Sequence, residues 1–126
     1  MIVSIGIDIA EVYRIKETIA RTPRFAERVF TDAEKAYCES KGAAAAQSYA
    51  GRFAAKEAFL KALGTGWRGK VAWRDIEVIL DDQGAPSLSV AGAAKELLDA
   101  TEATKVHVSI SHTADHAVAQ VILEKV

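Results

Sequence analysis

Apolar and polar residues alternate with a period of two near both ends of the chain. In the N-terminal segment, Ile5, Ile7 and Ile9 alternate with smaller or polar residues, which predicts a β-strand over residues 2–9. The side chain of Asp8 then leaves the strand on the face opposite the isoleucines. From alternation and flanking turn residues we expect four further strands, over residues 76–80, 85–90, 106–111 and 116–123.

The segments between these strands carry helical signals. In residues 11–21 apolar side chains recur three and four positions apart, and Pro23 then interrupts the helix and suits the first turn of another. Thr31 and Glu34 form a capping-box pattern, which predicts a helix that begins after Thr31 and ends by Gly42. Two more helices are expected over residues 45–63 and 91–100.

This order of elements indicates the fold class. Helices dominate the first half of the chain and antiparallel strands the second, which is typical of an α+β fold with a mainly antiparallel sheet. A length of 126 residues suits one domain, residues 1–126, with a modest core.

The predicted helix over residues 45–63 has an unusual distribution of charge. Its apolar side chains are spread around the whole circumference, so we expect it to be largely buried. Glu57 and Lys61 nevertheless lie four positions apart on one of its faces. They are either an ordinary solvated ion pair or part of a site that binds an ion, because buried charges need a partner.

Composition excludes several classes of protein. A net charge of −1 argues against a general role in nucleic-acid binding or on membrane surfaces. No apolar run is long enough to span a bilayer, and the first residues do not resemble a signal peptide. Cys38, the single cysteine, has no metal-ligand spacing and is interpreted as a packing residue in a reducing, cytoplasmic setting.

Two carboxylates stand in settings that favour a metal. Gly6 precedes Asp8 on the same face of the first strand and leaves room there for another element or a ligand. Carboxylates with lysines nearby suit Mg²⁺ and phosphate, since Mg²⁺ favours one or two carboxylates plus phosphate oxygens and water. A role for Asp8 as a helix cap remains the alternative.

Four arginines follow one another at spacings of seven, three and four, and they are Arg14, Arg21, Arg24 and Arg28. Such a run is either a solvated face or a surface for an acidic protein or phosphates. Ser111 and His112 do not indicate nucleophilic catalysis, because adjacent residues on a strand face opposite ways.

Three segments together resemble the motifs of a known family. They are Gly6-Ile7-Asp8-Ile9-Ala10-Glu11-Val12, the stretch from Arg52 to Gly66, and Val108-Ser109-Ile110-Ser111-His112-Thr113. These motifs are similar to those of the holo-[acyl-carrier-protein] synthases, the short bacterial type of 4′-phosphopantetheinyl transferase. The resemblance runs over almost the whole chain; Ala10 departs from it, where a larger aliphatic residue is more usual.

The resemblance implies a reaction and a metal. The 4′-phosphopantetheine arm of coenzyme A would pass to a serine hydroxyl of apo acyl carrier protein, and adenosine 3′,5′-bisphosphate would be released, in support of fatty acid biosynthesis. Asp8 and Glu57 would hold Mg²⁺, and Lys61 would contact the same phosphates. Glu57, directly or through a water, would accept the serine proton.

The resemblance also implies binding surfaces. Residues on the nucleotide side of coenzyme A would be Arg52, Gly64, Thr65, Gly66, Ser111, His112 and Thr113. The acidic carrier protein would dock on Arg14, Arg21 and Arg24. Active sites would lie between the subunits of a homotrimer. Two other classes remain open: a module that binds coenzyme A or a carrier without transfer, and a Mg²⁺-dependent phosphohydrolase of nucleotides.

Overall fold

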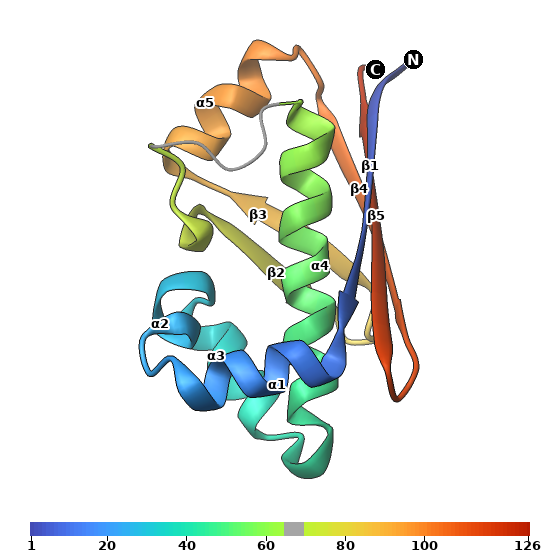
Figure 1. The fold of residues 1–126 in the computed structure, drawn as a ribbon. Coiled ribbons are helices and arrows are strands. Elements are labelled where there is room, and N and C mark those ends of the chain that lie inside the picture. Colours follow the sequence, from blue (N-terminus) through green and yellow to red (C-terminus); the bar gives the residue numbers. More distant parts are fainter. Residues whose placement is uncertain (65–69) are drawn as a thin grey trace.

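The computed structural model describes residues 1–64 and 70–126, in which two antiparallel sheets pack against a long central helix (Figure 1). One sheet has three strands in the order β1-β5-β4, and the other pairs β2 with β3. The strands are β1 (Ile2–Glu11), β2 (Ile76–Leu80), β3 (Pro86–Val90), β4 (Lys105–His112) and β5 (His116–Glu124).

Helices surround both ends of the central helix α4. Three of them lie near its first residues, and α5 lies near its last (Figure 1). The helices are α1 (Val12–Arg21), α2 (Phe25–Val29), α3 (Asp32–Glu39), α4 (Ala45–Leu63) and α5 (Gly92–Ala100), with short 3₁₀ turns η1 (Gly42–Ala44) and η2 (Trp73–Asp75).

The α+β class and each predicted helix and strand are confirmed, with ends displaced by a few residues at most. The capping box is present with both of its hydrogen bonds. The backbone N–H of Glu34 donates to Oγ1 of Thr31 over 3.2 Å, and the N–H of Thr31 donates to Oε1 of Glu34 over 2.8 Å. Local signals were sufficient here because caps and turns act within a few residues of sequence.

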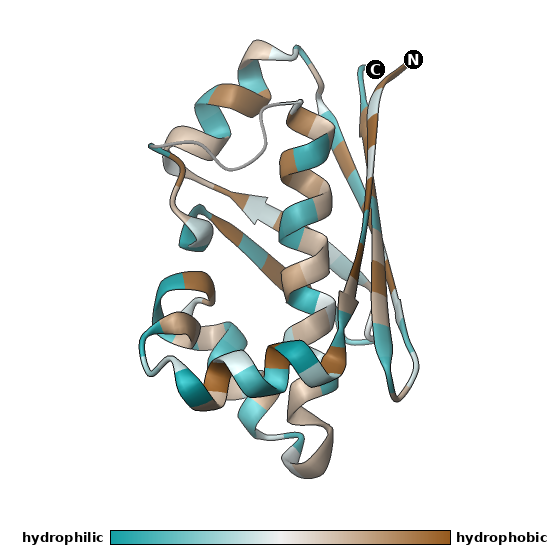
Figure 2. Ribbon diagram, in the orientation of Figure 1, coloured by the Kyte–Doolittle hydropathy of each residue, from teal (hydrophilic) through white to brown (hydrophobic). Residues whose placement is uncertain are grey.

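The first strand presents its larger residues to solvent. Ile5, Ile7 and Ile9 are more than half exposed in the single chain, whereas Gly6 and Ala10 are buried against the core. Figure 2 shows hydrophobic residues along most of β1. In register with them on β5, Ile122 pairs with Ile5 and Val118 with Ile9, whereas Gln120 pairs with Ile7, so the outer face of this sheet is largely apolar along β1 and β5.

Helix α4 is buried on most sides within one chain, as its apolar circumference predicts. Eleven of its 19 residues are buried, because β1, β5 and β4 pack on one side and α1, α3 and β2 on others. Packing between chains is therefore not needed to explain its composition. The buried lysine of α4 is Lys56, whereas Lys61 is half exposed.

The core near the first turns of α4 is aromatic. Phe25 and Phe30 meet edge to face, and Phe53 stacks on Trp73 with ring centroids 5.4 Å apart. Cys38 is fully buried, in agreement with its interpretation as a packing residue. Of the helices that the structure describes, none is both long and apolar enough to cross a membrane.

Candidate active site

Strand β1 crosses α4 so closely that only glycine fits at the crossing. A Cβ atom on Gly6 would lie 2.0 Å from the carbonyl oxygen of Ala58 and 2.7 Å from the backbone nitrogen of Ala62. The space that Gly6 leaves beside Asp8 is thus filled by helix α4 and not by a ligand. This contact brings the end of β1 against the face of α4 that carries Glu57 and Lys61.

At this crossing Lys61 pairs with the first strand. Its Nζ donates to Oδ1 of Asp8 over 2.8 Å and to the carbonyl oxygen of Ile7 over 3.1 Å. The Asp8 side chain is only 14% exposed, while that of Lys61 is 52% exposed. Of the two alternatives for Glu57 and Lys61, an ordinary ion pair between them is therefore not the contact that forms, and Lys61 joins α4 to β1 instead.

Glu57 completes a site with two carboxylates. Burial raises the pKa of Glu57, the charge of Asp8 raises it further, and Lys61 opposes both effects. A bound cation would relieve the repulsion between the two carboxylates. Hard oxygen ligands of this kind fit Mg²⁺, which takes one or two carboxylates and completes its shell with phosphate oxygens and water. Within residues 1–64 and 70–126, no cluster of three or more His, Cys, Asp or Glu side chains could hold a metal, so the described chain offers no third ligand of these kinds beside Asp8 and Glu57.

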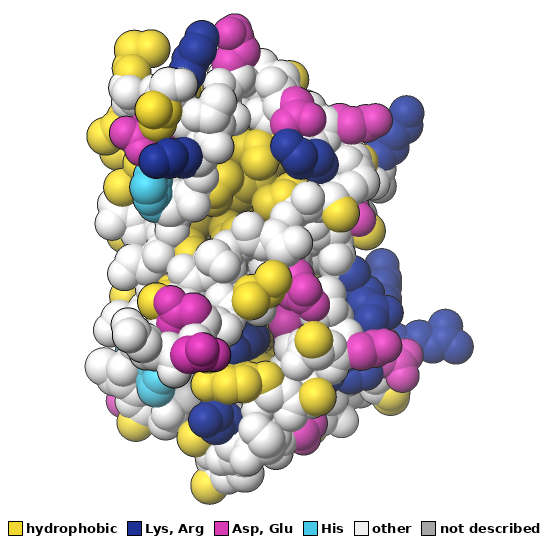
Figure 3. Space-filling view, turned by 180° about the vertical axis from the view of Figure 1, so that it is seen from behind, with side chains coloured by type: hydrophobic (Ala, Val, Ile, Leu, Met, Phe, Trp, Pro, Cys, Tyr) yellow, Lys and Arg dark blue, Asp and Glu magenta, His cyan; other side chains and the backbone are white. Residues whose placement is uncertain are grey.

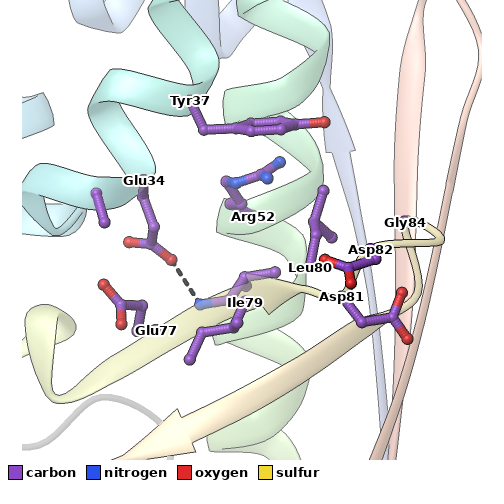
Figure 4. A pocket seen from close by; sticks show the side chains of 11 residues that line it. Glu34, Tyr37, Arg52, Glu77, Ile79, Leu80, Asp81, Asp82 and Gly84 are labelled. Atoms are coloured by element: carbon purple, nitrogen blue, oxygen red, sulfur yellow. Dashed lines mark hydrogen bonds between the residues drawn. The ribbon is translucent and has the colours of Figure 1, made fainter.

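Arg52 lies in a second region, at a pocket of about 460 Å³ between α3, α4 and β2 (Figure 4). Its guanidinium carbon is 4.2 Å from the ring centroid of Tyr37, and its Nη1 donates to the carbonyl of Ser48 at a long 3.3 Å. Arg52 is only 7% exposed, and its buried Nε has no hydrogen-bond partner among the described residues. A buried guanidinium with so few partners is suited to bind an anion.

Arg52 and Glu57 point to different sides of α4. They are five residues apart, which corresponds to about 140° around a helix that turns 100° per residue. One chain therefore does not bring the predicted nucleotide-binding arginine together with Asp8, Glu57 and Lys61. His112 does lie with Arg52, at a smaller pocket of about 170 Å³.

The hairpin between β4 and β5 carries the remaining predicted ligands. Ser111 pairs with Val118 and lies on the outer face of the sheet, whereas His112 pairs with Ala117 on the face toward α4. The opposite orientation expected for Ser111 and His112 is confirmed. Thr113 forms the turn, and its Oγ1 accepts from the backbone N–H of His116 over 3.1 Å.

The glycine-rich segment after α4 is described only at its first residue. Gly64 ends the helix in the left-handed conformation with φ of 80°, as a C-terminal stop should. Thr65 and Gly66 lie outside the described residues.

The predicted carrier-binding residues Arg14 and Arg21 are exposed on α1, and Arg24 is exposed between α1 and α2. Seen from behind, Lys and Arg side chains gather along the edge of the molecule on the side of α2 (Figure 3). Two of the predicted carrier-binding arginines have acidic neighbours: Arg14 lies 3.6 Å from Glu11, the last residue of β1, and Arg21 lies 3.2 Å from Glu17 on α1. Exposed pairs of this kind are weak and leave the basic character available to a partner.

Sequence reasoning missed an apolar groove beside Arg24. It has a volume of about 420 Å³ and is lined by Thr22, Arg24, Phe25, Arg28, Val29, Phe53 and Trp73. Its aromatic residues come from three separate segments, α2, α4 and η2. Only Phe25, next to Arg24 in the sequence, could have indicated it.

Comparison with known proteins supports the resemblance in the sequence. Residues 4–121 match the family model of the 4′-phosphopantetheinyl transferase superfamily. The holo-[acyl-carrier-protein] synthase of Koribacter versatilis (strain Ellin345) is 48% identical over 125 residues, which covers 98% of this chain and 99% of that protein.

Solved structures agree with the fold. The holo-(acyl-carrier-protein) synthase of Bacillus anthracis str. Ames in complex with CoA (3′,5′-ADP) has a TM-score of 0.83 and 44% identity, and covers 100% of this chain and 99% of that chain. The Helicobacter pylori holo-[acyl-carrier-protein] synthase in complex with coenzyme A has a TM-score of 0.82 and 34% identity, over 95% and 99% of the two chains. Together with the paired carboxylates at the crossing of β1 and α4, these matches show that the chain belongs to the 4′-phosphopantetheinyl transferase superfamily.

Proposed function

We propose that this chain is a holo-[acyl-carrier-protein] synthase. It transfers 4′-phosphopantetheine from coenzyme A to a serine hydroxyl of apo acyl carrier protein and releases adenosine 3′,5′-bisphosphate. The observation that carries the proposal is the meeting of Asp8, Glu57 and Lys61 at the crossing of β1 and α4. The names of relatives that match nearly the whole chain support it.

Asp8 and Glu57 would hold Mg²⁺. When bound, the ion would neutralise charge on the pyrophosphate of coenzyme A. Lys61 would contribute a second positive charge, since its ammonium already lies at the same site and its side chain is exposed enough to turn toward a phosphate.

The serine oxygen would form a bond to the phosphorus that bears the pantetheine arm. The bond from that phosphorus to the bridging oxygen would break, and adenosine 3′,5′-bisphosphate would leave. Glu57, which lies with Asp8 at the site, would accept the serine proton directly or through a water.

The nucleotide part of coenzyme A would be bound by Arg52, Gly64, Thr65, Gly66, Ser111, His112 and Thr113. Arg52 faces away from Glu57 on α4, so a complete site would combine two chains. The outer face of β1, with Ile5, Ile7 and Ile9 exposed, offers an apolar surface for other copies. Both observations support a homotrimer with active sites between subunits.

The acidic carrier would dock on Arg14, Arg21 and Arg24. Positive charge on this side would speed encounter with an acidic partner, and the groove beside Arg24 would take an apolar side chain of the carrier. The free thiol of Cys38 fits a reducing cytoplasm, where the product would serve fatty acid biosynthesis.

The intact mass of an apo carrier protein tests the function. After incubation with the chain, coenzyme A and Mg²⁺, the carrier should gain the mass of one phosphopantetheine. If a competent carrier gains no mass in the presence of folded protein, the proposed transferase activity is wrong, and a binding module is the remaining candidate. Release of bisphosphate without carrier would instead identify a phosphohydrolase.

A further inference from the structure

Lys56, the residue before Glu57, is completely buried and makes three hydrogen bonds. Its Nζ donates to Oε1 of Glu34 over 2.7 Å, to the carbonyl oxygen of Val29 over 2.6 Å and to the carbonyl oxygen of Trp73 over 3.3 Å. Both side chains of the ion pair are 0% exposed. All three protons of the ammonium are therefore used, on acceptors from three segments of the chain.

A buried ion pair is a costly way to fill a core. Removing two charges from water carries a desolvation penalty, and well-packed apolar residues of similar volume often stabilise a protein as well or better. Lys56 nevertheless offers what an apolar residue cannot, namely hydrogen bonds to two backbone carbonyls. The location of those two carbonyls indicates what the lysine does.

Val29 and Trp73 both line the groove beside Arg24. Val29 is the last residue of α2, a helix of five residues whose terminal carbonyls lack partners within the helix. Trp73 is the first residue of η2, and its ring stacks on Phe53 in the same groove. The ammonium of Lys56 thus donates to the backbone of two residues that line the groove, one on α2 and one on η2.

The position of Lys56 on α4 connects this groove to the carboxylate site. Phe53, one turn earlier, contributes to the groove, and Glu57, the next residue, lies at the crossing with β1. Glu34 extends the connection further, because its Oε2 accepts from the backbone N–H of Val78 on β2 over 2.8 Å (Figure 4).

We propose that Lys56 is a positioning residue for carrier binding, which holds the walls formed by α2 and η2 at a fixed separation through the carbonyls of Val29 and Trp73. The inference rests on the proposed function, because it takes the groove as part of the docking surface for the carrier. A short helix and a 3₁₀ turn have few contacts of their own, and ordering them only upon binding would weaken affinity. A groove ordered in advance avoids that loss.

The test is Lys56→Met, which keeps an unbranched side chain one atom shorter than lysine and removes the three donors. We expect KM for the apo carrier, and the dissociation constant measured by calorimetry without turnover, to rise about tenfold, a loss typical of ordering a few side chains on binding. KM for coenzyme A should stay within about twofold, because Lys56 makes no hydrogen bond to the residues proposed to bind the nucleotide. Leu123→Ala is the matched control: it truncates a fully buried residue on β5, distant from the groove in sequence and sheet, and should lower the melting temperature without changing carrier affinity.

Equal carrier affinity in Lys56→Met and the natural chain, or an equal loss in Leu123→Ala, would overturn the proposal. If the natural chain transfers nothing to the carrier, the result counts against the proposed function alone. The effect of Lys56 on the groove can still be measured in the absence of a carrier. For that purpose Trp67→Phe leaves Trp73 as the single tryptophan, and Lys56→Met should then increase quenching of its fluorescence by acrylamide.

Glu34→Gln provides a second variant that is less disruptive than removal of the lysine. Lys56 would lose its carboxylate partner but as a neutral amine could still donate to Val29 and Trp73. We expect a lower melting temperature with Trp73 quenching close to that of the Trp67→Phe parent. Quenching as strong as in Lys56→Met would show that the ion pair, and not the two carbonyl bonds, orders the groove.

Discussion

Lys61 on α4 and Asp8 on β1 form an ion pair with Nζ 2.8 Å from Oδ1, at the place where the proposed metal would bind. The ammonium also donates to the carbonyl of Ile7, so two oxygens of β1 already surround a positive charge. A divalent cation at Asp8 and Glu57 would repel this ammonium at short range. We therefore expect this repulsion to turn Lys61 from Asp8 toward phosphate when metal and coenzyme A are bound.

Lys61→Met should separate metal binding from phosphate binding. Without the competing ammonium, affinity for Mn²⁺ in the absence of coenzyme A should be unchanged or higher, measured by electron paramagnetic resonance. The transfer rate should fall by about 10- to 100-fold, because a charged hydrogen bond is worth about 1.5–3 kcal/mol. Lys95→Met, which removes an exposed pair with Asp99, is the control. Weaker Mn²⁺ binding in Lys61→Met would mean that the lysine only holds Asp8 in place.

Asp8→Ala and Glu57→Ala should each nearly abolish transfer. Loss of one of two metal ligands removes several kcal/mol of charge stabilisation, or about 1000-fold in rate. Rates over a Mg²⁺ titration measure the effect, and Glu96→Ala on the exposed face of α5 should behave like the natural chain. Near-normal rates for either variant at every Mg²⁺ concentration would contradict the metal assignment.

Gly6→Ala should disrupt the crossing of β1 and α4. The new Cβ would meet the backbone of Ala58 at 2.0 Å, and backbone on both sides leaves it no flexible neighbour to displace. We expect a loss of about 3 kcal/mol in the free energy of unfolding, at the upper end for overpacking, together with weaker Mn²⁺ binding. Urea denaturation and calorimetry measure the two effects.

Gly51→Ala is the matched control for Gly6→Ala, since its Cβ would meet only a side-chain methyl of Ile110 at 3.1 Å. A stable Gly6→Ala protein with unchanged Mn²⁺ affinity would show that the strand can move away without disturbing the carboxylates.

Arg14→Glu should weaken binding of the carrier but not of coenzyme A. Reversal of one charge on the basic surface should raise carrier KM by several-fold and reduce its dependence on salt concentration, because electrostatic attraction between the partners falls. Steady-state kinetics at several NaCl concentrations provide the measurement. The same reversal at Lys95, on the distant helix α5, should have little effect; an equal effect there would indicate general charge dependence without a docking surface.

Cys38 should make stability fall in alkaline solution. Burial raises the pKa of the Cys38 thiol to about 11, compared with about 8.5 for an exposed thiol. Between these two values the unfolded chain loses its proton first and so binds fewer protons than the folded chain, and stability must fall as pH rises. The shift corresponds to a decline of about 3 kcal/mol, complete only above the folded pKa.

Cys38→Ala isolates this effect, since it keeps every other titrating group. Urea denaturation from pH 8 to pH 11 should show a shallower decline in the variant. Parallel curves for the two proteins would mean that the thiol is accessible to solvent in the folded state.

The secondary structure of this protein was predictable from its sequence because the signals are local. Strand alternation at Ile5, Ile7 and Ile9, the capping box of Thr31 and Glu34, and the stop at Gly64 each depend on residues a few positions apart. The pairing of Asp8 with the site of Glu57 was also expected, from the resemblance of the motifs.

Tertiary packing decided which of the similar residues near the site do which task. Lys56 and Lys61 are both neighbours of Glu57 in sequence, but rotation about α4 directs Lys56 into the core and Lys61 to Asp8. The same rotation separates Arg52 from Glu57. Sequence spacing determines the angle between two side chains on a helix, whereas the elements that pack against each side determine whether a charge meets solvent, an ion or a backbone carbonyl.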